Sequence, residues 1–246
     1  MEADSSREPY YKTLIRRGYT YLTCSEKHYI FEKERVVVKI AKSEYNNSET
    51  DESYYIEKAA LDLLSLHGLP VAKVHKIYAK GELLDDFTVL EEEKVNGVVY
   101  YKKDSKEDIL RQALNLMTEA TKIAGSKFGL MDKDGEAKYS SWQEFLLEVV
   151  EKMPQDERRL CVQKIESMPK PEKPSFVFTD CNMGNFIFRG KRLEKAIDVE
   201  RPLWGDKLFL YGVIKSRNPY MYRMAPEREE NEIIRFYAKI YPYIFK

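Results

Sequence analysis

Residues 176–206 read FVFTDCNMGNFIFRGKRLEKAIDVERPLWGD, and the rest of the chain is interpreted around them. Two short apolar runs, Phe176 to Phe178 and Phe186 to Phe188, predict strands, because aromatic and β-branched residues favour a pleated surface. Between the second run and a third that ends at Ile197, the residues Arg189-Gly190-Lys191 predict a tight hairpin turn. The stretch therefore predicts a strand, a polar loop and a β-hairpin.

Polar side chains occupy the ends of these predicted strands. Asp180 and Asn185 stand on the loop, and Asp198 and Glu200 come just after the third strand. Loops held by a rigid sheet are where catalytic side chains tend to lie. Any one of these residues alone is as typical of a simple turn. Three of them at these intervals, between apolar strands, favour a catalytic site.

The order and spacing of Asp180, Asn185 and Asp198 resemble those of the aminoglycoside phosphotransferase and choline kinase group, whose fold is protein kinase-like. In that group the loop usually reads His-Gly-Asp, four residues and Asn, and Ile-Asp-Trp-Glu or Ile-Asp-Trp-Asp follows the hairpin. Here the second motif reads Ile-Asp-Val-Glu, and Phe178 and Thr179 replace the usual His and Gly. The second motif is therefore well kept, and the first departs from the pattern.

The resemblance implies a role for each polar residue of the stretch. Asp180 would orient or deprotonate the acceptor hydroxyl, and Asn185 and Asp198 would bind Mg²⁺ against the nucleotide phosphates. Glu200 would make a further contact to the metal or the loop. The implied cofactors are ATP, or GTP, and Mg²⁺. The implied substrate is a small molecule with a hydroxyl group, whose identity a fold does not fix.

Length and composition set limits on the class of protein. A chain of 246 residues fits one large domain or two small lobes. Lys plus Arg and Asp plus Glu number 41 each, so no net charge attracts nucleic acid or an anionic membrane, and we expect neither as a partner. The composition does not indicate an oligomeric state.

The cysteines and the apolar runs indicate a compartment. Cys24, Cys161 and Cys181 are an odd number at wide intervals, a pattern that fits neither a disulfide framework nor a structural zinc site. The first residues are polar and acidic, unlike a signal peptide, and no apolar run approaches the length of a membrane span. These features predict a protein of the reducing cytoplasm.

The first part of the chain predicts an antiparallel sheet and one helix. Aromatic and β-branched runs at 19–24, 28–31 and 36–41 are separated by polar turns, which is typical of a meander. Two more strands are predicted at 74–78 and 87–90. Between them and the meander a helix is predicted from Ser48, which forms a capping-box pattern with Asp51, to Gly68.

Lys39 is the single charged residue within the apolar run 36–41. In the group that the chain resembles, a lysine on such a strand contacts the α- and β-phosphates and pairs with a glutamate of the following helix. Helical periodicity places Glu57 at the margin of the buried stripe, so we assign it as that partner. Glu52 is the alternative, and a solvated lysine and helix face would be the ordinary explanation.

The segment Glu93-Lys94-Val95-Asn96-Gly97 resembles the short linker of the same group, whose backbone binds adenine. Glu93 and Val95 are therefore the expected nucleotide contacts of the linker. The expected division is a nucleotide-binding lobe, residues 1–93, and a catalytic and substrate-binding lobe, residues 94–246. Residues 19–28 contain no glycine, so the glycine-rich cover common over nucleotide phosphates is missing from the sequence.

Beyond the linker the pattern is mainly helical. Ser105 with Asp108, and Ser141 with Glu144, read as capping boxes. Further helices are predicted over 156–168, over 207–215 with Asp206 as N-cap, and over 226–241.

The sequence thus predicts an α+β, two-lobed kinase-like fold, with a small antiparallel-sheet N-terminal lobe and a mainly helical C-terminal lobe. The predicted activity is ATP-dependent phosphorylation of a small-molecule hydroxyl. One alternative is a catalytically silent kinase-like binding protein, with a loop loosened by Phe178 and Thr179. The other is an unrelated α+β domain, in which Lys39 and Asp198 would not be neighbours.

Overall fold

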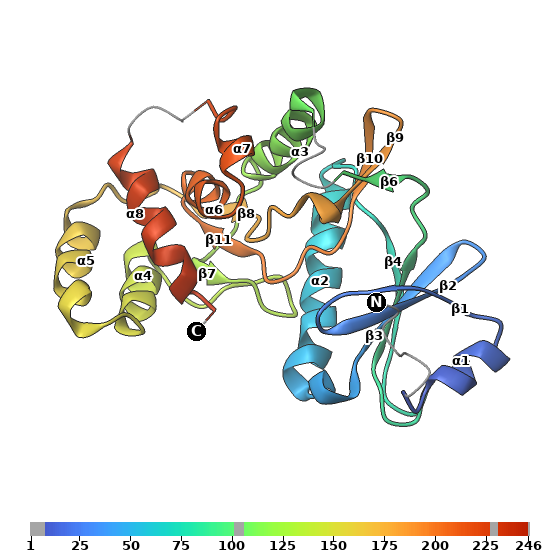
Figure 1. The fold of residues 1–246 in the computed structure, drawn as a ribbon. Helices are drawn as coiled ribbons and strands as arrows, with labels where there is room; N and C mark the ends of the chain where they lie inside the picture. The colour runs from blue at the N-terminus through green and yellow to red at the C-terminus, as the bar shows by residue number, and fades with distance from the viewer. Residues whose placement is uncertain (1–7, 101–105, 227–230, 246) are drawn as a thin grey trace.

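The computed structural model describes residues 8–100, 106–226 and 231–245. Figure 1 shows that strands β1 to β5 gather on one side of the molecule and helices α4 to α8 on the other. Among the described residues, no helix is both long and apolar enough to cross a membrane.

The first part is built on a five-stranded antiparallel sheet in the order β1-β2-β3-β5-β4. Its strands are β1 (Thr20–Cys24), β2 (His28–Lys33), β3 (Val36–Ala41), β4 (Val74–Tyr78) and β5 (Val89–Glu93). The predicted meander is confirmed. A short helix, α1 (Tyr11–Arg16), places Leu14 in the apolar cluster beside Phe31 and Phe87, where burial of each large apolar side chain contributes about 1.5–3 kcal/mol.

Helix α2 (Ser48–Leu66) connects β3 to β4 and buries Tyr54, Leu61 and Leu64. Its N-cap is Asn47, whose side chain accepts a hydrogen bond from the Thr50 amide at 3.0 Å. The predicted capping box from Ser48 is therefore wrong by one residue. Asn47 has the extended backbone that an N-cap needs, and Asn caps a helix as well as Ser does.

Helices form most of the second part. They are α3 (Glu107–Ala120), α4 (Trp142–Glu151), α5 (Gln155–Ser167), α6 (Phe209–Arg217), α7 (Pro219–Tyr222) and α8 (Glu232–Ile240), with 3-10 turns η2 (Ser43–Tyr45) in the first part and η3 (Met183–Asn185) and η4 (Tyr241–Tyr243) here. At the centre of this part lies Trp142, which is fully buried and donates a hydrogen bond to the Tyr237 hydroxyl at 2.9 Å.

The caps of these helices correct and confirm the sequence analysis. Ser141 and Glu144 form the predicted reciprocal capping box at α4. Ser105 lies outside the described residues, and α3 begins after Lys106 without a side-chain cap. Asp206 caps the turn before α6, since one oxygen accepts from the Leu208 amide at 2.9 Å.

The ends of two predicted helices also differ from the structure. Helix α6 begins at Phe209 and not at Lys207. Helix α8 begins at Glu232, capped by Asn231, and not at Pro226; the residues between, 227–230, are outside the described part of the chain.

Two small sheets hold the loops of the second part. One has the order β10-β9-β6, and the other β7-β11-β8. Their strands are β6 (Val98–Val99), β7 (Gly129–Leu130), β8 (Ser175–Val177), β9 (Phe186–Arg189), β10 (Arg192–Ala196) and β11 (Leu203–Gly205). The polar loop of the sequence analysis therefore leaves one small sheet at β8 and enters the other at β9.

The two parts are joined by backbone contacts at the hairpin. Ala72 donates to the Ala196 carbonyl, and Ala196 donates to the Pro70 carbonyl, both at 2.8 Å. Gly97 lies so close to β9 that a Cβ atom there would be 2.5 Å from the Phe188 carbonyl oxygen. The linker is thereby fixed against the hairpin that precedes Asp198.

Candidate active site

A cavity of about 820 Å³ lies between the five-stranded sheet, the linker and the hairpin β9–β10. This volume is typical of a small-molecule site. The strands β1 to β3 and β5 contribute Leu22, Ile30, Val37, Lys39 and Glu92, the linker contributes residues 93–99, and the second part contributes Asn182, Asn185, Ile187, Ile197 and Asp198. Most of the residues that the sequence analysis singled out therefore surround one space.

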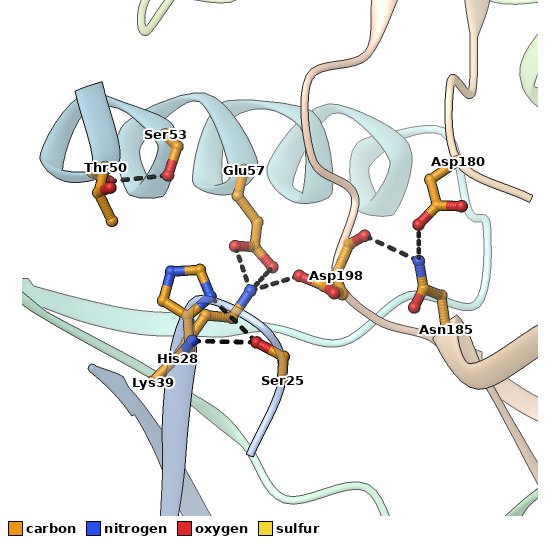
Figure 2. A network of polar contacts seen from close by, with 9 residues as sticks. All are labelled: Ser25, His28, Lys39, Thr50, Ser53, Glu57, Asp180, Asn185 and Asp198. Carbon is orange, nitrogen blue, oxygen red and sulfur yellow. Dashed lines mark hydrogen bonds and ion pairs between the residues drawn. The ribbon is translucent and has the colours of Figure 1, made fainter. Parts of the chain in front are cut away.

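Lys39, which lines this cavity, meets Glu57 of helix α2 (Figure 2). The Lys39 Nζ atom lies 3.0 Å from Glu57 Oε1 and 2.7 Å from Oε2. Both side chains are almost completely buried, whereas Glu52 is exposed. Of the two glutamates considered, the structure thus brings Glu57 to Lys39.

Asp198 also pairs with Lys39, through Oδ1 and the Nζ atom. Its backbone has φ 57°, a left-handed conformation that Asp tolerates better than most residues but that still costs about 1 kcal/mol or more. The preceding Ile197 donates its amide to the Asn185 carbonyl at 2.8 Å. The hairpin end and the polar loop are therefore held together just beside Lys39.

Asp198 lies between Lys39 and the pair formed by Asp180 and Asn185, as Figure 2 shows. Asn185 Nδ2 donates to Asp180 Oδ2 at 3.1 Å and to the Asp198 carbonyl at 3.4 Å. The other Asp180 oxygen accepts from the Asn182 amide at 2.9 Å. Both carboxylate oxygens of Asp180 are thus oriented by neighbours on its own loop.

Asp180 faces a second, smaller hollow of about 270 Å³, which it lines with Cys181, Asn182, Ser216 and Arg217. Asn182 lines this hollow and the large cavity alike. Asp180 therefore lines a hollow that shares Asn182 with the large cavity.

Around the cavity wall, acidic groups outnumber the one buried ammonium group, that of Lys39. Burial opposes the charged form of Lys39, but Asp198 and Glu57 outweigh it and raise the Lys39 pKa well above its ordinary value. Burial also opposes ionisation of Asp198, yet the Lys39 ammonium holds the pKa of Asp198 below its ordinary value. Burial, with the charge of Asp198, raises the pKa of Glu200. One buried ammonium thus faces several carboxyl groups, an arrangement that favours an added cation.

The family model for the phosphotransferase enzyme family matches residues 25–209, a span that contains Lys39, Glu57, Asp180, Asn185 and Asp198. The chain belongs to this family. The predicted class of activity, phosphoryl transfer by an enzyme, is confirmed, and a silent binding protein is not favoured. None of the curated proteins matches the sequence.

Solved structures of aminoglycoside phosphotransferases have the same fold as this chain. A thermostable mutant of aminoglycoside phosphotransferase APH(4)-Ia, in ternary complex with AMP-PNP and hygromycin B, matches with a TM-score of 0.74 at 18% identity, over 98% of this chain and 89% of that one. The GDP complex of a mutant aminoglycoside 2'-phosphotransferase-IIIa matches with a TM-score of 0.61 at 16% identity, over 96% of this chain and 85% of that one.

The amicoumacin kinase hAmiN, in complex with AMP-PNP, Ca²⁺ and Ami, matches with a TM-score of 0.56 at 15% identity, over 100% of this chain and 80% of that one. These likenesses confirm the predicted α+β, kinase-like fold.

This phosphotransferase holds its polar loop with Phe178 and Thr179, which replace the usual His and Gly, and with Tyr241, which the sequence analysis missed. Phe178 is buried edge-on against Phe176, with ring centroids 5.5 Å apart. The Thr179 hydroxyl contacts the carbonyls of Glu200 at 3.2 Å and Arg201 at 2.9 Å. The Tyr241 hydroxyl donates to the Thr179 carbonyl at 2.7 Å. The loop is therefore anchored without the usual His and Gly.

His28 is a further residue of the cavity wall that the sequence analysis did not single out as functional. It is 4% exposed, and its ring lies beside that of Tyr54, with centroids 5.6 Å apart. Burial and the nearby Lys39 lower the His28 pKa to about 3, so the ring is neutral at neutral pH. The sequence around a single His in a strand does not show that this residue will line a cavity.

The donor set suits Mg²⁺ bound together with phosphates. Asp198 offers carboxylate oxygens, and Asn185 offers its amide oxygen because its nitrogen is used in donation. Mg²⁺ commonly takes one or two protein oxygens and completes its shell with phosphates and water. Within the described part of the chain, no group of three or more His, Cys, Asp or Glu is placed to hold a metal by itself.

The linker residues lie where the sequence analysis expected them. Glu93 ends β5, and its carboxylate is engaged by Lys195 Nζ at 2.8 and 2.6 Å. Glu93, Val95 and Gly97 line the cavity. With the Glu93 side chain occupied, any contact of Glu93 with a nucleotide would come from its backbone.

Proposed function

We propose that this phosphotransferase transfers the γ-phosphoryl group of ATP to a hydroxyl group of a small molecule. The observation that carries the proposal is the convergence of Lys39, Asn185 and Asp198 at one cavity, with Glu57 paired to Lys39 and Asp180 lining a second hollow. Such transfer requires mainly positioning and charge stabilisation.

The nucleotide would lie in the large cavity, between a first lobe of residues 1–93 and a second of residues 94–246. The linker would hold the base through the backbone of Glu93 and Val95. Lys39, oriented by Glu57, would contact the phosphates, because an ammonium fixed in a buried wall stabilises their charge without reorganising. Solved structures with this fold hold AMP-PNP or GDP, so GTP is the second candidate nucleotide.

Mg²⁺ would be held by Asn185 and Asp198 and would neutralise charge on the phosphates. In the structure Asp198 is paired with Lys39, which it shares with Glu57. With nucleotide in place, Lys39 would be shared with the phosphates, which leaves the Asp198 carboxylate available to the metal. The low pKa of Asp198 keeps this ligand ionised at neutral pH.

The acceptor would enter the smaller hollow, where Asp180 meets its hydroxyl group. The hydroxyl oxygen forms the new bond to phosphorus, the bond from phosphorus to ADP breaks, and Asp180 takes the hydroxyl proton. Hydrogen bonds from Asn182 and Asn185 hold the carboxylate in place for this step. Such positioning is a main source of rate in phosphoryl transfer.

We place the enzyme in the cytoplasm, with no nucleic acid or membrane partner. The cysteines Cys24, Cys161 and Cys181 are free thiols, which suits a reducing compartment. Equal numbers of acidic and basic residues give no net field toward a polyanion.

A screen of acceptors tests the proposal. The protein is incubated with Mg-ATP and one hydroxyl compound at a time, drawn from amino sugars, amino alcohols and nucleosides, and ADP release and the mass of the acceptor are followed. We expect an acceptor that gains one phosphoryl group per ADP released. The matched control is Asp180→Asn, which should bind Mg-ATP but turn over far more slowly. ADP release without any phosphorylated acceptor across the screen would count against this function.

A further inference from the structure

Glu92 lies at the end of the cavity that adjoins the linker. It stands on β5, opposite Val37 of β3. Two residues further along the same two strands, Lys39 is opposite Leu90. Glu92, Val37 and Lys39 all line the cavity. Residues two apart on one strand are separated by roughly 6.6 Å. Glu92 is therefore displaced from Lys39 by about this distance along the sheet, toward the linker.

The Glu92 side chain is buried without a complete set of partners. The residue is 6% exposed, and its Oε2 atom has no hydrogen-bond partner among the described residues. Its two neighbours differ: Glu91 accepts from the Tyr78 hydroxyl at 3.2 Å, and Glu93 is engaged by Lys195. Buried polar atoms nearly always have partners, so an unpaired carboxyl oxygen in a cavity wall points to a donor supplied by a ligand.

The surroundings indicate which portion of a nucleotide would lie there. Val37 is opposite Glu92, and on the other wall Ile187 is opposite Val99 of the linker. These apolar side chains suit the faces of a flat ring. Lys39, Asn185 and Asp198 suit the phosphates, so the base belongs at the Glu92 end.

We propose that Glu92 recognises position 6 of the purine, accepting a hydrogen bond from the exocyclic amino group of adenine and so selecting ATP over nucleotides with a 6-keto group. This inference rests on the proposed function, because it requires a nucleotide in the large cavity. Adenine has a donor at position 6, whereas guanine and hypoxanthine have a carbonyl oxygen there. Burial raises the pKa of Glu92 to about 7, so above that pH the group is mainly a carboxylate. A carboxylate only accepts hydrogen bonds, so it attracts the first group and repels the second.

The charged groups that act on Glu92 are Lys39 from β3, Asp198 after the hairpin, and Glu93 on its own strand. Lys39 is already paired with Glu57 and Asp198. The Glu92 carboxyl group is therefore the acidic group of the cavity wall that is best placed to read the base.

Calorimetric titration with Mg-ATP, Mg-ITP and Mg-GTP at about pH 8, where Glu92 is mainly ionised, tests the inference. ITP carries the 6-keto group without the 2-amino group of GTP. A hydrogen bond to a charged partner typically corresponds to a ratio of about 10- to 100-fold in affinity, so we expect ATP to bind that much more tightly than ITP. Glu92→Gln, whose amide can also donate to a keto group, should reduce the ratio to about 3-fold or less. The matched control is Glu91→Gln on the same strand, which should leave the ratio unchanged.

The outcomes separate this inference from the proposed function. If the parent protein binds ITP or GTP as tightly as ATP, or if Glu92→Gln keeps the full preference for ATP, the assignment of Glu92 is wrong while the nucleotide site stands. If none of the three nucleotides binds, the proposed function and the inference both fail. The comparison of ATP with ITP on the parent protein needs no variant, so a poorly folded variant does not prevent the test.

Discussion

Tyr241→Phe removes one hydroxyl group and with it the hydrogen bond to the Thr179 carbonyl. That bond is 2.7 Å long, and Tyr241 and Thr179 are 8% and 3% exposed. Burial raises the pKa of Tyr241 to about 12, so the hydroxyl is a protonated donor at neutral pH. The variant keeps the ring and leaves a buried carbonyl without this donor, at a cost of about 1–3 kcal/mol.

For a chain of this length, each kcal/mol lowers the melting temperature by about 2–4 °C. We therefore expect Tyr241→Phe to melt about 2–12 °C below the parent in a calorimetric scan. Thr179 immediately precedes Asp180, so a loosened backbone should also displace the carboxylate. Misplacement of a catalytic group by about 1 Å can lower the rate about 100-fold, and a fall in kcat of roughly 10- to 100-fold is expected.

The matched control is Tyr55→Phe, which removes the hydroxyl of a tyrosine that is 41% exposed on α2. Its effect on stability should remain within about 0.5 kcal/mol. If Tyr241→Phe has the melting temperature of the control and the kcat of the parent, Tyr241 does not hold the loop. Another group must then hold the loop in place of the usual His and Gly before Asp180.

Three further predictions concern the cavity wall and the linker. Asp198→Asn should weaken Mg²⁺-dependent ATP binding in calorimetry, because Mg²⁺ prefers a charged oxygen; unchanged affinity would remove Asp198 as a metal ligand. Burial raises the Glu92 pKa from 4.5 to about 7, so the stability that this group provides is complete below pH 4.5 and is lost as the pH rises through about 7. The gap is worth roughly 3 kcal/mol, and urea unfolding at pH 5 and pH 8 should show this loss in the parent and not in Glu92→Gln. Gly97→Ala should lower stability by about 1–3 kcal/mol, since its Cβ would lie 2.5 Å from the Phe188 carbonyl oxygen; Gly184→Ala, whose Cβ would approach its nearest neighbour, Asn182, only to 3.6 Å, is the control, and equal melting of the two variants would contradict the close approach.

The sequence predicts which side chains lie together when they are close along the chain or on regular strands and helices. Asp180 and Asn185 lie on one loop, and Asp198 follows the next hairpin, so their order alone placed them together. Lys39 and Glu57 are 18 residues apart and still meet, because strand alternation and helix periodicity each face one side chain toward the cavity.

Contacts between distant segments were beyond the reach of local patterns. Tyr241 reaches Thr179 across 62 positions, and nothing in the sequence connects η4 with the loop. The choice between Asn47 and Ser48 as N-cap was equally open, because both residue types cap helices and the backbone conformation decides. Glu92 stands among three consecutive glutamates, and only the register of β5 shows which of them faces the cavity beside Lys39.

The comparison of Asp180→Asn with the parent protein tests the central claim most directly. The substitution keeps the shape of the side chain and removes the charge that receives the proton, so kcat with any phosphorylated acceptor should fall about 10²- to 10⁴-fold. Calorimetric binding of Mg-ATP should remain within about 3-fold of the parent, because Asp180 lines the smaller hollow and not the large cavity. Turnover as fast as that of the parent would show that Asp180 is not the catalytic group and that the proposed mechanism is incorrect.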